Sequence, residues 1–480
     1  MLQKKRMIGF LLVLCLLATV FAGCSDGKDP QSTSNSTPDA SGTTSAPADS
    51  TPAETTPAPE TTELNFNGYE FTMGASAEWV EKWMPAAGVN TLDDELLDEY
   101  AALEEQYGFT INVVQADNLI ENVMPVVMGG DVPWDVFEMK TAQFFPLAVQ
   151  NYLVNYDSEE MKAAGLDVDD PALVNIPLSR LSVIAGKQWG IRCCSKYDLP
   201  EFGYGILFNK DMVANAGYPA ETLYQMVRDG EWNFTAYKDL AGKIAKDNDG
   251  DGQWDVYSAG GGKNPYGSEV LLAGGSAIEE RDGKWVYTLN EANSIQGLQF
   301  MYDVFNSGHR LIGGAGDSRT AFAQEQVGML WAAGFYLQND TIKGCEFEYG
   351  LIPMPKGDDV EGYVDAISSP SEMIIFAGKA DYDVNIPILS LWCTVMNSED
   401  NWVEPVKEDF FRGSDEDMEM LTEYILPNLR LATYKLSAEM ETLIENEVYW
   451  KVQAGELTPA QAAEAVSAQV QSILDGTFNK

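Results

Sequence analysis

The stretch from residue 203 to residue 257 constrains the fold of this chain more than any other. It predicts a buried strand over 204–209, then two helices, then a loop of aspartate and glycine. The second helix starts after Asn233, whose side-chain oxygen can accept from the free N–H groups of the first turn. Its apolar residues recur every three to four positions and predict one packed face: Tyr237, Leu240, Ala241 and Ile244. The stretch shows no motif of a nucleophile or of an acid–base pair, so we interpret it as scaffold around a cleft.

The region before residue 140 also alternates strands with helices. Strands are predicted over 69–74, 110–115 and 134–139. A helix between the first two begins at Thr91 as its cap and ends at Gly108. Strands separated by helices indicate βαβ units and a largely parallel sheet, so the fold class is α/β.

Ligands of such sheets bind beyond the carboxyl ends of the strands. Three side chains of this region follow or end a predicted strand, namely Trp79, Glu138 and Lys140. We therefore predict that these three residues contact a ligand.

Composition excludes several classes of function. The formal net charge of −44 repels phosphate backbones, so nucleic-acid binding is not expected. His309 is the single histidine, so a multi-histidine zinc site is not expected, and a histidine base could only be His309 itself. Carboxylate pairs suited to glycoside hydrolysis arise by chance among 74 acidic residues, and we predict no catalytic residue.

The amino-terminal residues 1–23 predict a secretory signal peptide. Three basic residues precede an apolar segment, 7–20, that is short for a membrane-spanning helix. The sequence Phe21-Ala22-Gly23-Cys24 then resembles a bacterial lipobox, in which Cys24 would carry the lipid, although Phe21 stands where leucine is usual. Ordinary secretion with cleavage near Ala22 is the alternative.

Residues 24–63 are rich in serine, threonine, proline and alanine. Such a composition cannot bury enough apolar surface to offset the entropy of ordering the chain. We predict a disordered linker that tethers the folded part to a lipid anchor at the extracellular face of the cell membrane.

Several pieces of the sequence together resemble the family 1 extracellular solute-binding proteins of ABC importers, of the sugar-binding type. The pieces are LFNKDMVANAGY and EWNFTAYKDLAGKIAKDNDGDGQWD within 203–257, GDVPWDVFEM (130–139), GMLWAAGFY (328–336), YGLIPMPKG (349–357) and AGELTPAQAAEAVSAQVQSIL (454–474). Their order and spacing carry the resemblance, which extends over most of residues 65–480.

The resemblance implies a two-lobe, periplasmic-binding-protein-like fold with strands that cross between the lobes. The amino-terminal lobe would hold 64–198 and 364–420, and the carboxy-terminal lobe 199–363 and 421–480. In this arrangement the chain leaves the second lobe near Tyr363 and returns to the first lobe for residues 372–397. The final helix is marked locally by a capping box of Thr458 and Gln461.

Aromatic residues make up 11% of the chain, and a sugar site needs aromatic faces together with planar polar groups. Tyr336 stands where sugar-binding members of the family carry a stacking aromatic residue after a glycine. Phe202 and Tyr204 precede the FNKD strand end, and Trp331 precedes Gly334. We predict that these four residues contact the ligand, and packing in the core is the alternative for each.

The loop after residue 246 has the spacing of a calcium-binding EF-hand loop. Carboxylates stand at its positions 1, 3, 5 and 9, glycine stands at position 6, and a backbone carbonyl is offered at position 7. The predicted ligands are Asp247, Asp249, Asp251, Gln253 and Asp255. Position 12 is Ser258 rather than the usual glutamate, so a solvated turn is the alternative to a Ca²⁺ site. We expect no required cofactor.

Four cysteines remain once the signal peptide and the lipid-bearing residue are set aside: Cys193, Cys194, Cys345 and Cys393. Their spacing matches no zinc site, and the sequence does not determine which of them pair. A bridge between the adjacent Cys193 and Cys194 would force unusual backbone geometry, and free thiols are the alternative.

These observations predict a monomeric, lipid-anchored receptor that binds a carbohydrate-class ligand between two lobes and delivers it to the permease subunits of an ABC transporter. The receptor would act by closing around its ligand and not as an enzyme. A secreted glycan-degrading enzyme and a surface adhesion lipoprotein are the two alternatives.

Overall fold

The structure is a computed structural model, and it describes residues 64–116, 120–193, 201–261, 267–367, 371–396 and 402–479. The chain divides into two compact units, Met1–Thr62 and Glu63–Lys480, and every described element belongs to the second. The predicted signal peptide, the linker, Cys24 and Cys194 lie outside the described residues.

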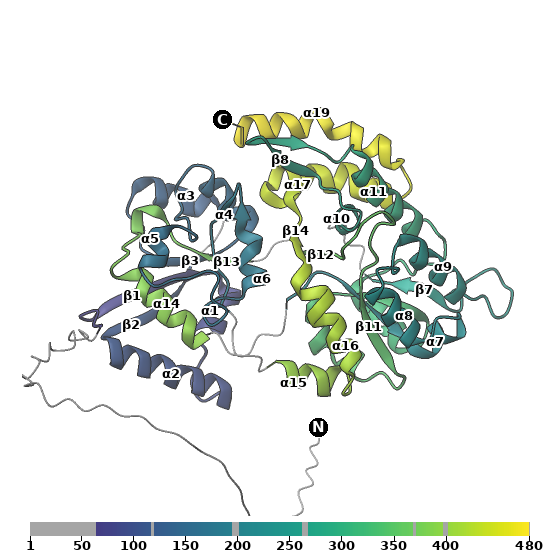
Figure 1. The fold of residues 1–480 in the computed structure, drawn as a ribbon, viewed down its shortest axis with the longest axis horizontal. Helices are drawn as coiled ribbons and strands as arrows, with labels where there is room; N and C mark the ends of the chain where they lie inside the picture. Colours follow the sequence, from purple (N-terminus) through teal and green to yellow (C-terminus); the bar gives the residue numbers. More distant parts are fainter. Residues whose placement is uncertain are drawn as a thin grey trace, which may run out of the picture. The chain divides into compact units, whose positions relative to one another are not determined.

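The first sheet has the strand order β13-β3-β1-β2 (Figure 1). Its strands are β1 (Tyr69–Ala75), β2 (Phe109–Gln115), β3 (Val136–Lys140) and β13 (Ser371–Ile374). Strands β2 and β3 are both parallel to β1, which confirms the parallel arrangement predicted for this region. Strand β13 comes from a distant part of the chain and pairs antiparallel to β3, with Glu372 opposite Met139.

The helices of the first region are α1 (Ala77–Trp83), α2 (Thr91–Tyr107), α3 (Ile120–Gly129), α4 (Thr141–Ala148), α5 (Glu159–Ala163), α6 (Ile176–Ser179) and α14 (Asn385–Met396). Helix α2 ends at Gly108, as predicted, in the left-handed conformation with a φ of 67°. Its cap, however, is Asn90 and not Thr91, because the Asn90 side chain accepts from the Asp93 N–H at 2.9 Å. A buried cluster that includes Phe71, Leu96 and Trp392 joins the sheet to α2 and α14.

The second sheet has the order β11-β6-β10-β7. Its strands are β6 (Gly205–Asn209), β7 (Tyr257–Gly260), β10 (Val327–Ala332) and β11 (Tyr349–Pro353). Strand β6 is antiparallel to both β10 and β11, whereas β7 is parallel to β10. Every residue of β6, β10 and β11 is buried, which explains their continuous apolar sequences.

The longer helices of the second region are α8 (Ala220–Arg228), α9 (Phe234–Ile244), α11 (Ala292–Phe305), α12 (Ala315–Ala323) and α19 (Pro459–Thr477). Its shorter helices are α7 (Lys210–Asn215), α10 (Ser268–Leu272), α13 (Asp340–Lys343), α15 (Val403–Pro405), α16 (Asp415–Glu419), α17 (Ala438–Ile444) and α18 (Trp450–Gln453). Asn233 caps α9 through the Ala236 N–H at 2.9 Å, and the four predicted apolar residues of α9 are buried, so both predictions are confirmed.

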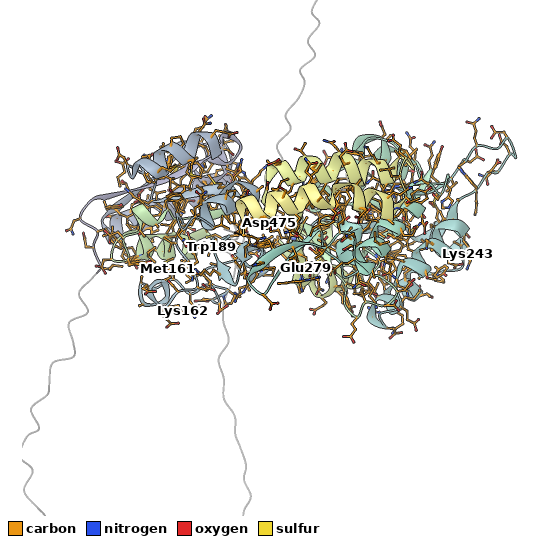
Figure 2. The ribbon with its side chains drawn as sticks, turned by 90° about the horizontal axis from the view of Figure 1, so that it is seen from above. Met161, Lys162, Trp189, Lys243, Glu279 and Asp475 are labelled. Atoms are coloured by element: carbon orange, nitrogen blue, oxygen red, sulfur yellow. The ribbon has the colours of Figure 1, made fainter. Side chains whose placement is uncertain are left out.

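The carboxy-terminal helix α19 carries the predicted capping box of Thr458 and Gln461. A hairpin of β8 (Ile278–Arg281) and β9 (Lys284–Tyr287) lies against α19, since the Tyr287 N–H donates to the Gln471 Oε1 at 3.0 Å (Figure 2). Among the described helices, none combines the length and the apolar character that crossing a membrane requires.

The contacts revise the predicted assignment of residues 364–420 to the first lobe. Strand β12 (Asp365–Ile367) pairs with β14 (Leu429–Leu431) and not with the first sheet. The Leu351 N–H of β11 donates to the Asp417 carboxylate of α16 at 2.7 Å. Only the described residues 371–396 of this segment therefore pack with the first sheet, through β13 and α14.

Candidate ligand-binding site

One edge of the second sheet gathers aromatic and charged side chains. The parallel strands β7 and β10 both end there, and the antiparallel strand β6 begins there, with Gly205 opposite Ala332. Arg310 lies beside β7, because the Leu311 N–H donates to the Ala259 carbonyl at 2.9 Å. Tyr204, Trp331 and Arg310 therefore belong to the same edge of the sheet.

Arg310 is the most unusual residue of this edge. Its side chain is buried, with 4% of the residue exposed, and its guanidinium lies over the Trp331 ring at 4.1 Å and the Phe305 ring at 4.7 Å. None of its three nitrogens has a hydrogen-bond partner in the part of the chain that the structure describes. Burial lowers the pKa of Arg310, and the nearby Tyr237 and Glu269 oppose that shift.

The groups around Arg310 are themselves hydrogen-bonded. The Trp331 Nε1 donates to the Tyr237 hydroxyl at 3.1 Å, and the Ser268 hydroxyl donates to the Glu269 carboxyl at 3.2 Å. Glu269 is 2% exposed, and burial raises the pKa of its carboxyl. The edge thus combines aromatic rings with a planar cation and a planar acid. The N–H groups of Arg310 are the donors here that lack an acceptor among the described residues.

Asp365 fixes the entry into β6. Its two carboxylate oxygens accept from the N–H groups of Gly203 at 2.7 Å and Tyr204 at 2.8 Å. Burial raises the pKa of Asp365 to about 7. A side chain at position 203 would collide with the backbone, since a Cβ atom there would lie 2.0 Å from the Ala366 carbonyl oxygen.

The two residues predicted to contact a ligand before β6 differ in burial. Tyr204 is partly exposed and packs at the margin of the core. Phe202 is 4% exposed and belongs to the apolar cluster of Leu207, Leu351 and Ile425. The packing of Phe202 therefore supports the alternative that it is a core residue, and its contact with a ligand stays a prediction. Trp331 is buried to the same extent, at 4% exposed.

Tyr336, which was predicted to be a stacking platform, lies in similar surroundings. It is 3% exposed, packs in the same cluster as Phe202, and carries the Arg319 guanidinium over its ring at 4.8 Å. Burial also raises the pKa of the Tyr336 hydroxyl. The exposed ring of this turn is the preceding residue, Phe335, at 66%. The packing thus supports the alternative that Tyr336 is a core residue.

The first sheet ends in a second group of polar residues, which includes Trp79 and Glu138. Arg192, which sequence reasoning missed, joins them: its guanidinium lies over the Trp79 ring at 4.7 Å. The Arg192 Nη1 also donates to the Glu138 Oε1 at 3.4 Å and to the Ser371 carbonyl at 2.9 Å. The Trp83 Nε1 donates to the other oxygen of Glu138.

Lys140 and Glu372 also lie at this end of the first sheet, and the sequence analysis singled out only Lys140. Lys140 was predicted to contact a ligand and lies exposed at the end of β3, where its backbone N–H donates to Gln143 at 3.2 Å. Glu372 was missed, although it is fully buried and neither carboxyl oxygen has a hydrogen-bond partner among the described residues. Burial raises the pKa of Glu372 well above its usual value.

An ion pair connects the first group to the segment that leads into β6. The Arg192 Nη2 lies 3.6 Å from the Glu201 carboxylate, one residue before Phe202. The polar end of the first sheet thus reaches the segment that precedes Tyr204.

The aspartate loop brings part of the predicted metal ligand set together. Carboxylate oxygens of Asp247, Asp249 and Asp255 lie within 4.8 Å of one another, whereas the Asp251 carboxylate is not part of this group. Asp247 accepts from the N–H groups of Gly250 at 2.7 Å and Gly252 at 3.0 Å, and these bonds lower its pKa. The three exposed carboxylates suit a Ca²⁺ ion, but the loop hydrogen bonds equally suit a solvated turn.

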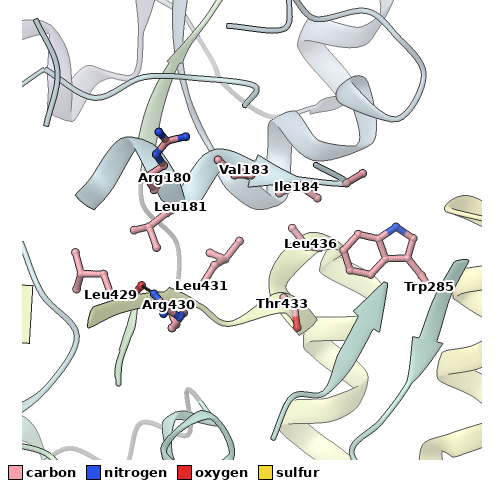
Figure 3. Close-up of a pocket in the computed structure, with 11 residues that line it drawn as sticks. Arg180, Leu181, Val183, Ile184, Trp285, Leu429, Arg430, Leu431, Thr433 and Leu436 are labelled. Carbon is pink, nitrogen blue, oxygen red and sulfur yellow. Dashed lines mark hydrogen bonds between the residues drawn. The ribbon is translucent and has the colours of Figure 1, made fainter. Parts of the chain in front are cut away.

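A cavity of about 280 Å³ opens elsewhere, between the segment 180–185 and the strand β14 (Figure 3). Its walls are mainly apolar and include Leu181, Ile184, Trp285, Leu431 and Leu436. The polar atoms of Arg180, Arg430 and Thr433 stand at its margin (Figure 3). Its lining contains none of the residues predicted to contact a ligand, so this cavity is separate from the two polar groups.

Comparison with known proteins agrees with this arrangement. A model of the bacterial extracellular solute-binding protein family matches residues 88–383. The chain therefore belongs to the bacterial extracellular solute-binding proteins. No protein in a search of curated sequences matches the chain significantly.

Solved structures of ABC-transporter binding proteins share the fold. A cyclic alpha-maltosyl-1,6-maltose binding protein from Arthrobacter globiformis has a TM-score of 0.57 and 15% identity, over 85% of this chain and 100% of that one. The sugar-binding protein MalE from Xanthomonas citri has a TM-score of 0.57 and 13% identity, over 85% and 98%. UgpB from Mycobacterium tuberculosis, in complex with glycerophosphocholine, has a TM-score of 0.56 and 14% identity, over 85% and 98%. These similarities confirm the predicted two-lobe α/β fold.

Proposed function

We propose that the protein is the substrate-binding receptor of an ABC importer and that it binds a sugar or oligosaccharide. The observation that carries the proposal is the Arg310 guanidinium, which is buried against Trp331 and lacks a partner among the described residues. Two of the structurally similar proteins are described as binding a sugar or a cyclic sugar, which supports the same ligand class.

The chemistry of this edge matches the surface of a sugar. A sugar ring offers C–H faces that pack on aromatic rings and hydroxyl groups that accept hydrogen bonds from planar donors. Leaving a buried donor unpaired costs about 1–3 kcal/mol, and more when the donor is charged. A hydroxyl oxygen bound to Arg310 removes that penalty, so ligand binding stabilises the site.

The polar group at the end of the first sheet supplies a second set of contacts in this proposal. Trp79 and Lys140 would meet the ligand from the first lobe, while Tyr204, Trp331 and Arg310 would meet it from the second. A ligand that contacts both lobes shifts the population towards the closed form. The closed form would then be recognised by the permease, and the receptor would act as a monomer.

Thermal unfolding of the full-length protein against a panel of malto-oligosaccharides and other glycans, with glycerophosphocholine as a separate probe, tests the ligand class. A ligand at a hundredfold excess over its Kd stabilises the native state by about 2.7 kcal/mol. We expect a glycan to raise the Tm of the wild type more than that of Arg310→Met at the same glycan concentration. A shift with glycerophosphocholine but with no glycan would refute the carbohydrate assignment.

We also propose that Cys24 carries a lipid anchor, which rests on the lipobox-like sequence before it. Cys24→Ser should abolish incorporation of labelled fatty acid and release the protein into the medium. Retention of the Cys24→Ser protein in the membrane fraction would contradict the anchor and leave the ligand assignment untouched.

A further inference from the structure

Two cysteines that are far apart in the sequence meet in the first region. The Sγ atoms of Cys193 and Cys393 lie 2.7 Å apart. Cys193 follows Ile191, which exchanges backbone hydrogen bonds with Met373 of β13. Cys393 lies on α14. The fold therefore brings one sulfur from each of two separate segments into direct contact.

The surroundings of this pair are apolar and closed to solvent. Cys193 is 2% exposed, Cys393 is 1% exposed, and both belong to the cluster that holds Trp392 and Tyr156. Burial, together with the two nearby thiols, raises the pKa of the Tyr156 hydroxyl. Each sulfur thus has the other within reach and little access to reagents in solution.

We propose that Cys193 and Cys393 form a disulfide bond in the exported protein. One thiolate attacks an external disulfide, that of a thiol-disulfide oxidoreductase or of oxidised glutathione, and gives a mixed disulfide with release of one thiol. The second thiolate then displaces the remaining external sulfur and closes the bond. The two cysteines lose two protons and two electrons, and the external disulfide is reduced to two thiols.

Burial sets when this reaction takes place. The folded structure encloses both sulfurs, so the external disulfide must act before α14 has packed onto the cluster. The extracellular location of the family provides a compartment in which a disulfide persists once it has formed.

The position of the pair gives the bond a structural role. Cys193 stands directly before residues 194–200, and Cys393 stands shortly before residues 397–401. The chain passes through both segments on its way from the first sheet to the second. The bond would therefore tie together the two places where the chain leaves the first sheet.

Cys345 differs from this pair. It packs in the cluster of the second sheet, where its Sγ lies 3.7 Å from the Thr341 carbonyl. Burial raises the pKa of the Cys345 thiol to about 11, which leaves very little thiolate at neutral pH. Cys345→Ser is therefore a matched control that should leave the proposed bond intact.

Peptide mapping of the full-length, exported protein tests the proposal. Free thiols are alkylated under denaturing conditions before reduction, and the digest is analysed by mass spectrometry. We expect the peptide with Cys193 to be linked to the peptide with Cys393. Because Cys194 lies in the same peptide, Cys194→Ser must keep this link and Cys193→Ser must lose it. Complete alkylation of Cys193 and Cys393, or a link that requires Cys194, would overturn the proposal.

Thermal unfolding gives an independent readout. Dithiothreitol should lower the Tm of the wild type and of Cys345→Ser by several degrees, and it should not change the Tm of Cys193→Ser or Cys393→Ser. An equal Tm of the wild type with and without dithiothreitol, when the peptide map also lacks the link, would contradict the bond.

Discussion

Two buried arginines of this protein have similar surroundings and different partners. Arg192 and Arg310 are 5% and 4% exposed, and each guanidinium lies over a tryptophan ring. Arg192 bonds to Glu138 and to the Ser371 carbonyl and pairs with Glu201, whereas Arg310 has no hydrogen-bond partner within the described residues. The comparison teaches that two equally buried charges can differ in their partners, and the proposed ligand-binding role of Arg310 rests on that difference.

Replacing Arg192 should have the largest effect on stability. Arg192→Met leaves the Glu138 carboxylate buried without its cation, and breaking a buried pair in this way destabilises by about 3–5 kcal/mol. Urea unfolding measures the loss. The control is Arg180→Met, because Arg180 pairs with Asp169 at the surface, where such pairs contribute about 0–1 kcal/mol. Equal losses of unfolding free energy in the two variants would contradict a structural role for Arg192.

The pH dependence of stability should reveal the protonation of Asp365, whose carboxylate accepts hydrogen bonds from the backbone at the start of β6. Its pKa is raised to about 7 in the folded protein and is about 3.9 in the unfolded chain. The folded state thus binds the proton more tightly than the unfolded chain. Protonation of Asp365 therefore contributes its full stabilisation below about pH 4, and this contribution is lost as the pH rises to about 7. The size of this loss is at most about 4 kcal/mol.

Urea unfolding at several pH values between 4 and 8 measures this dependence. The buried Glu269, Glu372 and Asp417 also have raised pKa values and act in the same direction. The informative quantity is therefore the difference from Asp365→Asn, which should show a shallower decline between pH 4 and pH 7. Identical slopes in the two proteins would show that Asp365 does not bind a proton in this range.

Replacing Arg310 should affect ligand binding more than stability. Arg310→Met removes a buried charge that has no hydrogen-bond partner among the described residues, so the free energy of unfolding should fall less than in Arg192→Met. Loss of the donors should weaken the glycan identified by thermal unfolding by roughly 1–3 kcal/mol, about tenfold to a hundredfold in Kd. Calorimetric titration measures the Kd. If Arg310→Met lost as much stability as Arg192→Met and kept its affinity for the glycan, Arg310 would have a structural role like that of Arg192.

The aspartate loop should give the smallest effect, because its carboxylates already accept hydrogen bonds from the loop itself. If Ca²⁺ binds there, a chelator should lower the Tm of the wild type slightly and leave Asp249→Asn unchanged. Asp251→Asn is the matched control, since Asp251 lies outside the group formed by Asp247, Asp249 and Asp255. No response of the wild type to the chelator would identify the loop as a turn.

Local patterns predicted the local structure well. The buried face of α9 and its Asn233 cap follow from helical spacing and from one side-chain oxygen, both of which are encoded within 12 residues of sequence. The error at α2 is also local, because Asn90 and Thr91 are adjacent residues that both suit a cap. The family resemblance implied only that residues 372–397 return to the first lobe, and the pairing of β13 with β3 was not predicted, since no local signal specifies a distant strand partner.

The candidate site was predicted less completely for the same reason. Trp79 and Glu138 were found because they end or follow strands, a position that sequence can locate. Arg310 was missed because its role depends on Trp331 and on the absence of a partner among the described residues, and both are set by long-range packing. Tyr336 was taken for a platform because its sequence context does not show that Arg319 and an apolar cluster cover it.

The late arrival of β13 in the first sheet also affects how the protein is made. Its neighbour β3 ends at Lys140, and β13 begins at Ser371, so about 230 residues must be synthesised between the two strands. At roughly 5–20 residues per second, the ribosome needs about 12–46 s for that distance. During this interval β3 presents an unpaired edge to which other chains can add. The first sheet, which begins near the amino terminus, is therefore completed only after most of the chain has been translated. Until then, the open edge of β3 exposes the chain to aggregation.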